Sequence, residues 1–208
     1  MNRRLFIKGS ATALPATVAL QMLSTRFAYA QDFSGDVDVL NYALTLEYLE
    51  SEFYRQGNAA GLLSGKDKTY LEAIGADEDA HVAAISQTIE KLGGTPVKAP
   101  AVDFGKSFAS TTSYLKTAHV FENTGVSAYL GAAGFITNPD ILQAAAGIFG
   151  VEARHAAIIG ELLGLAPEGG VYMGATETAM TKDEVLEAVA PFLAADSGAM
   201  AGGAAVTL

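Results

Sequence analysis

The sequence predicts an all-α protein: a four-helix bundle followed by a short extra helix towards the C-terminus. Three observations predict this fold. Apolar residues recur at helical spacing in four long stretches, no stretch has the alternation typical of strands, and Gly or Pro residues separate the stretches. Each amphipathic helix must bury one apolar stripe, and a four-helix bundle buries four such stripes together.

The first two helices are expected at about residues 36–56 and 68–92. In the first stretch, apolar residues lie three and four positions apart, and Gly57 provides a typical helix end. Gly93 and Gly94 would end the second helix, and two prolines mark the linker that follows. These two helices would form the first helix pair of the bundle.

The third and fourth helices are expected at about residues 108–136 and 139–163, and Pro139 suits the first turn of the fourth helix. A capping box that begins at Thr181 predicts a short fifth helix, which would reach about residue 195. Pro191 would kink this helix or end it early.

Residues 1–30 are predicted to be an export signal of the twin-arginine type. Arg3 and Arg4 precede a hydrophobic pair and Lys8, and the segment ends in Ala28-Tyr29-Ala30, which has the small residues of a cleavage site. The alternative is a membrane anchor, but the apolar run is too short and too rich in small residues to span a bilayer comfortably. We expect a periplasmic or otherwise exported protein, without stable membrane insertion after cleavage.

The remaining chain divides into the bundle at residues 31–165 and a C-terminal extension at residues 166–208. The extension contains the short helix and a Gly/Ala-rich tail from Ala194, which is expected to be flexible.

The composition excludes several classes of protein. The chain has no Cys, which rules out disulfide scaffolds, thiolate catalysis and Cys-based metal sites. Its 23 acidic and 13 basic residues give a net charge of −10, which argues against nucleic acid as a partner.

Two of the three histidines have a Glu three residues earlier: Glu78 precedes His81, and Glu152 precedes His155. On a helix, residues three apart project from nearly the same face, one turn apart. A carboxylate and an imidazole placed in this way can bind one metal ion or two neighbouring ions.

The other two long helices each carry a Glu and, seven residues later, a Tyr on the same apolar stripe: Glu47 with Tyr54, and Glu122 with Tyr129. These two pairs are 75 residues apart, and the two Glu-x-x-His motifs are 74 residues apart. The chain therefore resembles two copies of one helix pair, which would place four carboxylates and two imidazoles in a shared core.

Four clustered carboxylates cannot all stay ionised unless cations lie between them, and two divalent ions would balance their charge. Three further residues remain open. Glu50 could be an additional or alternative ligand, His119 could reach the site or belong to its surroundings, and Arg154 could pair with a carboxylate.

A lone Glu on two helices with Glu-x-x-His on the other two resembles the ligand set of the ferritin-like di-iron and di-manganese carboxylate proteins. The segment Leu44-Thr45-Leu46-Glu47 with Tyr54 is similar to the first-helix ligand segment of bacterioferritin-like proteins. Over residues 36–165 the chain looks closest to the exported ferritin-like domain proteins of bacteria.

This resemblance implies two metal ions, with Fe favoured and Mn as the alternative. It implies terminal ligands at Glu47 and Glu122, bridging ligands at Glu78 and Glu152, and one imidazole ligand on each ion, from His81 and His155. It also implies that Tyr54 and Tyr129 are hydrogen-bond partners of the ligands or redox-active catalytic neighbours.

The leading functional hypothesis is an exported di-iron protein that reacts with O₂ or peroxide and serves in oxidative stress or iron handling. As an enzyme it would be an oxidoreductase of the ferroxidase or peroxidase type, with a small oxidant or ferrous iron as its partner. The alternatives are a manganese catalase-like enzyme and a non-catalytic stress or desiccation protein with a structural metal site. The sequence leaves open whether the chain forms a homo-oligomer.

Overall fold

The computed structural model of the chain describes residues 33–194. Within this range the chain forms five α-helices, two short 3₁₀ turns and two isolated β-bridges. The all-α prediction is therefore confirmed for the described residues. The predicted export signal at residues 1–30 and the predicted flexible tail beyond Ala194 lie outside them.

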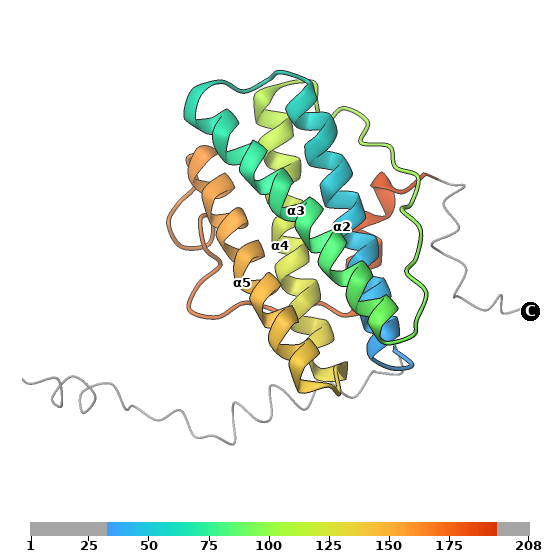
Figure 1. Ribbon diagram of the computed structural model, residues 1–208. Coiled ribbons are helices and arrows are strands. Elements are labelled where there is room, and N and C mark those ends of the chain that lie inside the picture. Colours follow the sequence, from blue (N-terminus) through green and yellow to red (C-terminus); the bar gives the residue numbers. More distant parts are fainter. Residues whose placement is uncertain (1–32, 195–208) are drawn as a thin grey trace, which may run out of the picture. The chain divides into compact units, whose positions relative to one another are not determined.

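Two helical hairpins make up the bundle (Figure 1). Helix α2 (Asp36–Ala59) packs against α3 (Gly65–Lys91), and α4 (Thr111–Ala132) packs against α5 (Pro139–Leu162). Residues 92–110 return along the length of the bundle, so α3 and α4 run in the same direction. A bundle with one long crossover connection results.

The helix bounds differ from the predicted ones near glycines. Helix α2 continues past Gly57 to Ala59. A side chain at Gly57 would meet the ring of Tyr114. Gly57 thus serves close packing and does not end the helix. Helix α3 begins at Gly65, three residues before the predicted start.

The third helix begins at Thr111 and not at about residue 108, because Ser110 and Ser113 form a capping box there. It ends at Ala132, and a 3₁₀ turn at Ala133–Phe135 follows. As predicted, Pro139 occupies the first turn of α5, where the side chain of Asn138 caps the helix.

The described part of the C-terminal extension packs on the bundle. The predicted capping box at Thr181 is confirmed and opens α6 (Lys182–Val189). This helix ends six residues before the predicted end, because Pro191 lies in the 3₁₀ turn Ala190–Phe192 that follows it. The ring of Phe192 packs edge-on against Phe121 of α4, with the centroids 4.7 Å apart.

The two ends of the bundle have different cores. Near the start of α2 the core is aliphatic, with Leu40, Leu44 and Ile89 among its buried residues. Near the end of α2 it is aromatic, and Phe53 lies 4.9 Å from Phe121, measured between ring centroids. Between these two cores lies a layer of buried charged side chains. In the described part of the chain, no helix is long and apolar enough to cross a membrane.

Candidate metal centre

The structure brings the six predicted ligand side chains together in the middle of the bundle. They form two groups of four, and within each group one ligand atom per residue lies within 4.8 Å of the others. The two groups share two carboxylates, as expected for ligands that bridge two ions. The first group is Glu47, Glu78, His81 and Glu152, and the second is Glu78, Glu122, Glu152 and His155.

Each of the four helices contributes at the same level of the bundle. The Glu-x-x-His spacing places Glu78 beside His81 on α3 and Glu152 beside His155 on α5. All four carboxylate residues of the two groups have 0% exposure, and the two histidines are at most 8% exposed. Burying so many ionisable groups is unfavourable unless they are paired or coordinate metal ions.

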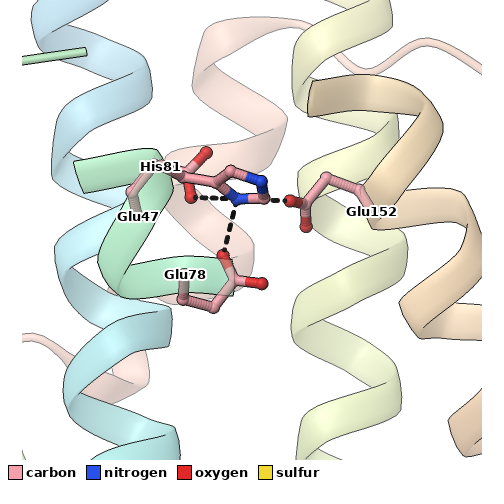
Figure 2. Close-up of side chains that lie close together, drawn as sticks. All are labelled: Glu47, Glu78, His81 and Glu152. Atoms are coloured by element: carbon pink, nitrogen blue, oxygen red, sulfur yellow. Dashed lines mark hydrogen bonds and ion pairs between the residues drawn. The ribbon is translucent and has the colours of Figure 1, made fainter. Parts of the chain in front are cut away.

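The first group is arranged around one imidazole nitrogen (Figure 2). The Nδ1 atom of His81 lies 3.2 Å from Glu47 Oε2, and 3.1 Å from both Glu78 Oε2 and Glu152 Oε1. Carboxylate oxygens from three different helices thus converge on one point. The same point can hold a proton or a cation, because both are attracted by this concentration of oxygen atoms.

The second group repeats this arrangement around His155. Its Nδ1 atom lies 3.0 Å from Glu78 Oε1 and 3.3 Å from Glu122 Oε2. Glu78 therefore directs one oxygen towards each imidazole, since its other oxygen faces His81. A carboxylate in this position can join two metal ions.

The two tyrosines connect the helix pairs crosswise. The Tyr54 hydroxyl donates to Glu122 Oε1, and the Tyr129 hydroxyl donates to Glu47 Oε1. Each tyrosine lies about 10 Å along its helix from the Glu seven residues before it, which is too far for a hydrogen bond. It therefore bonds to the Glu of the other helix. Burial and the adjacent carboxylate raise the pKa of both tyrosines, so both remain protonated donors.

Asp77 is a functional candidate that the sequence reasoning missed. Its Oδ2 atom lies 3.2 Å from His155 Nε2, on the opposite side of the ring from the carboxylate cluster. A carboxylate that accepts from the outer ring nitrogen fixes the orientation of a ligating imidazole and makes it a stronger ligand. Asp77 is exposed, whereas Glu78 beside it in the chain is fully buried.

Glu50 is a fifth buried carboxylate beside the cluster, with 4% exposure. It belongs to neither group of four, so it does not replace Glu47. The other two open residues lie elsewhere. His119 Nε2 donates to the carbonyl oxygen of Gly170 at 2.9 Å and thereby anchors the segment after α5. Arg154 is exposed.

Electrostatics within the cluster favours keeping positive charge between the carboxylates. Burial raises the pKa of Glu47 to about 7, with His81 opposing and Glu78 adding to this shift. Burial and the charges of neighbouring carboxylates raise the pKa of Glu152 well above its ordinary value. Four ionised carboxylates at this density repel one another strongly, so protons or cations must lie among them.

For Glu78 and the two histidines, contacts with oppositely charged groups outweigh the effect of burial on the pKa. Burial also disfavours ionisation of Glu78, but its contacts with His155 and His81 outweigh burial and lower its pKa to about 2. Burial alone would lower the pKa of the histidines. Contacts with the carboxylates instead raise it to about 12 for His81 and about 11 for His155.

The donor atoms of the cluster fit metal ions. Buried polar atoms normally have hydrogen-bond partners, and the exceptions require an explanation. Among the described residues, most of the buried side-chain oxygen and nitrogen atoms that have no hydrogen-bond partner lie in this cluster. They are Glu47 Oε2, Glu78 Oε1, Glu122 Oε2, both carboxylate oxygens of Glu152, and His155 Nδ1.

Comparison with known proteins agrees with this geometry. The model of the ferritin-like domain family matches residues 35–165, which is more than half of the chain. The chain therefore belongs to the ferritin-like domain family, and the resemblance drawn from its Glu and Glu-x-x-His pattern is confirmed. The matched range contains the four long helices and all six residues of the two groups. The chain has no match among the curated proteins.

Proposed function

We propose that this ferritin-like protein binds two metal ions, with Fe favoured, and uses them to react with O₂ or peroxide. The observation that carries the proposal is the pair of four-residue groups that share Glu78 and Glu152. Two ions held by shared carboxylates lie close enough to act on one small molecule. When bound, two ferrous ions supply two electrons to O₂, which with two protons leaves as hydrogen peroxide.

In this proposal the two groups supply matched ligands. Glu47 and His81 would hold one ion, Glu122 and His155 would hold the other, and the two shared carboxylates would contribute to both. Oxygen ligands stabilise the more highly charged, oxidised ions, and the buried position limits side reactions with bulk water.

The tyrosines and Asp77 orient these ligands. The hydroxyls of Tyr54 and Tyr129 each donate to a terminal carboxylate, which leaves its other oxygen directed into the cluster. Asp77 holds the ring of His155 from outside. In the second helix pair, Val151 takes the place of Asp77, so the two imidazoles differ in their outer partners.

Metal analysis of protein that is expressed from the full sequence and exported by its own signal tests the base of the proposal. We expect about two ions per chain, and a large loss in the double variant with Glu78→Ala and His155→Ala. Less than about one ion per chain, unchanged in that variant, would reject the proposal. The same preparation tests the predicted signal, since cleavage after Ala30 would give a periplasmic protein that begins at residue 31.

The same donor set also accepts manganese, since carboxylate and imidazole ligands suit both metals. Oxygen release from peroxide, measured with Fe-loaded and Mn-loaded protein, separates the two functions. Release by the Mn-loaded form alone would favour a catalase-like enzyme. If metal stabilises the fold but neither O₂ nor peroxide oxidises the bound ions, the protein would instead be a non-catalytic structural protein.

A further inference from the structure

The two halves of the candidate metal centre have the same kinds of inner ligand. Each half has one unshared Glu and one His, and Glu78 and Glu152 belong to both. In each half a tyrosine hydroxyl donates to the unshared Glu. The two unshared Glu residues are equally buried, with 0% exposure. The kinds of inner ligand therefore do not distinguish one ion from the other.

The outer sides of the two imidazoles do differ. His155 Nε2 donates to Asp77 Oδ2 at 3.2 Å. Among the described residues, none accepts from Nε2 of His81, whose contacts all run through Nδ1. The His81 side chain is also the more open of the two, with 11% exposure against 5% for His155. One imidazole is thus held by a carboxylate from outside, and the other is not.

The internal repeat shows where this difference arises in the sequence. The two Glu-x-x-His motifs are 74 residues apart, so the position equivalent to Asp77 is Val151. An aliphatic side chain cannot accept a hydrogen bond from an imidazole. The second motif also carries a positive charge, since Arg154 stands where the first motif has Ala80. Helix α3 therefore supplies an outer carboxylate to the imidazole on α5, and α5 has no acidic residue at the equivalent position.

An outer carboxylate strengthens metal binding in two ways. It keeps the ring proton on Nε2, so that Nδ1 presents its lone pair to the ion, and it fixes the ring orientation before the ion arrives. Its negative charge also attracts the ion. Glu50, the fifth buried carboxylate, does not offset this difference, because it lies with the shared Glu152 against Gly125.

We propose that the ion at Glu122 and His155 binds first and is retained, whereas the ion at Glu47 and His81 binds second and exchanges with the solution. This inference rests on the proposed function, which places one ion in each half. Asp77 is the positioning residue that makes the two halves unequal. One position then stays loaded while the other takes up and releases an ion, which suits the handling of ferrous iron.

The first experiment determines the order of filling. Crystals of the exported protein are grown with one equivalent of Mn²⁺ per chain, and anomalous scattering measures the occupancy of each position. We expect the occupancy beside His155 to exceed that beside His81 several-fold. Equal occupancies, or more Mn²⁺ beside His81, would overturn the proposal. This experiment needs no variant, so it decides the proposal even if a variant does not fold.

The second experiment changes the outer partners and measures both Mn²⁺ affinities by titration calorimetry. Asp77→Asn should weaken the first ion about 10- to 100-fold and leave the second unchanged. Val151→Asp combined with Arg154→Ala copies the first motif into the second helix pair. This double variant should tighten the second ion about 10-fold or more, so that the two affinities become similar. A double variant with the two affinities of the wild type would overturn the role of the outer carboxylate.

Two controls accompany these variants. Asp79→Asn removes a negative charge from the same exposed part of α3, where Asp79 accepts from Ser51. Arg154→Ala alone removes the exposed positive charge without adding an acceptor. Both should keep the wild-type order of filling, and the melting temperature of each chelator-treated variant shows whether the fold is retained. An equal loss of the first ion in Asp79→Asn and Asp77→Asn would reduce the effect to surface charge and overturn the role of Asp77.

The outcomes separate this inference from the proposed function. If the protein binds no metal, both fail. If two ions bind with equal affinity, only the difference between the positions is overturned, and the dinuclear centre remains. If two ions bind unequally but neither O₂ nor peroxide oxidises them, the order of filling stands and the proposed reaction is rejected.

Discussion

Glu50 on α2 lies against Gly125 on α4, the residue that holds the equivalent position in the second helix pair. A methyl group added at Gly125 would lie 3.4 Å from Glu50 Oε1 and 3.2 Å from Glu152 Oε2. The absence of a side chain at Gly125 thus leaves room for the carboxylates of Glu50 and Glu152. A glycine inside a helix costs about 0.5–1 kcal/mol relative to alanine, so this space has a cost in stability.

Gly125→Ala is therefore expected to act on the metal centre and not on helix stability. Glu152 Oε2 would have to give by a few tenths of an ångström, whereas Glu50 Oε1 would be in ordinary van der Waals contact, so we expect Glu152 to shift and metal binding to weaken about 10-fold. Gly147→Ala is the control, since nothing lies within 4 Å of an added methyl there. That control should raise the stability by about 0.5–1 kcal/mol and leave the metal content unchanged.

Glu50→Ala in the Gly125→Ala background tests whether the two residues interact. Removing the Glu50 carboxylate should restore part of the metal affinity, because Glu152 could then move into the space that this carboxylate leaves. Melting temperature and metal analysis of both single variants and the double variant complete a double-mutant cycle. Strictly additive effects would show that the contact between Glu50 and Gly125 is unimportant.

Asp77→Asn is expected to weaken metal binding about 10- to 100-fold, because His155 would lose the carboxylate that orients its ring. Competition with a chelator of known affinity measures this loss. Asp79→Asn is the matched control on the same helix, since Asp79 accepts from Ser51 and contacts no cluster residue. Similar affinities for Asp77→Asn and the wild type would remove Asp77 from the site.

Tyr54→Phe and Tyr129→Phe should each destabilise the chelator-treated protein by about 1–3 kcal/mol, because a buried carboxylate oxygen loses its donor. Tyr114→Phe is the control: its hydroxyl donates to Asn58, away from the cluster. Thermal unfolding measures the three losses. If all three variants lose the same stability, the carboxylate partner adds nothing to the cost.

The chelator-treated protein is expected to lose stability as the pH rises from about 5 to 9. The folded state raises the pKa of Glu47 to about 7, so this carboxyl favours folding while protonated and loses that effect between its ordinary pKa and about 7. His81 and His155 have raised pKa values of about 12 and 11, so their contribution is complete below their ordinary pKa and declines above it.

Glu78 limits this trend at low pH. Its pKa is lowered to about 2, so its contribution is present above its ordinary pKa and lost as the pH falls towards 2. The melting temperature of the chelator-treated protein should therefore be highest near pH 5. Metal should reverse the slope above pH 5, because its ligands must be deprotonated. A melting temperature that rises steadily to pH 9 without metal would contradict the assigned electrostatics.

The helices and the six members of the cluster could be predicted from the sequence because both depend on local spacing. Three residues along a helix bring Glu78 and His81 to one face whatever the partner helices are. The repeat then gave the equivalent residues of the second pair. Helix ends were less predictable, since Gly57 resembles a terminator in sequence but serves contact with Tyr114 in space.

Only the tertiary structure decided how the parts meet. The crosswise bonds from Tyr54 to Glu122 and from Tyr129 to Glu47 join residues 68 and 82 positions apart, and no local spacing predicts them. The approach of Asp77 to His155 likewise depends on how α3 packs beside α5. The sequence determined which side chains share a helix face, because helical geometry is set within one turn. The packing of the helices determined which oxygens face the same nitrogen, because that depends on contacts between distant segments.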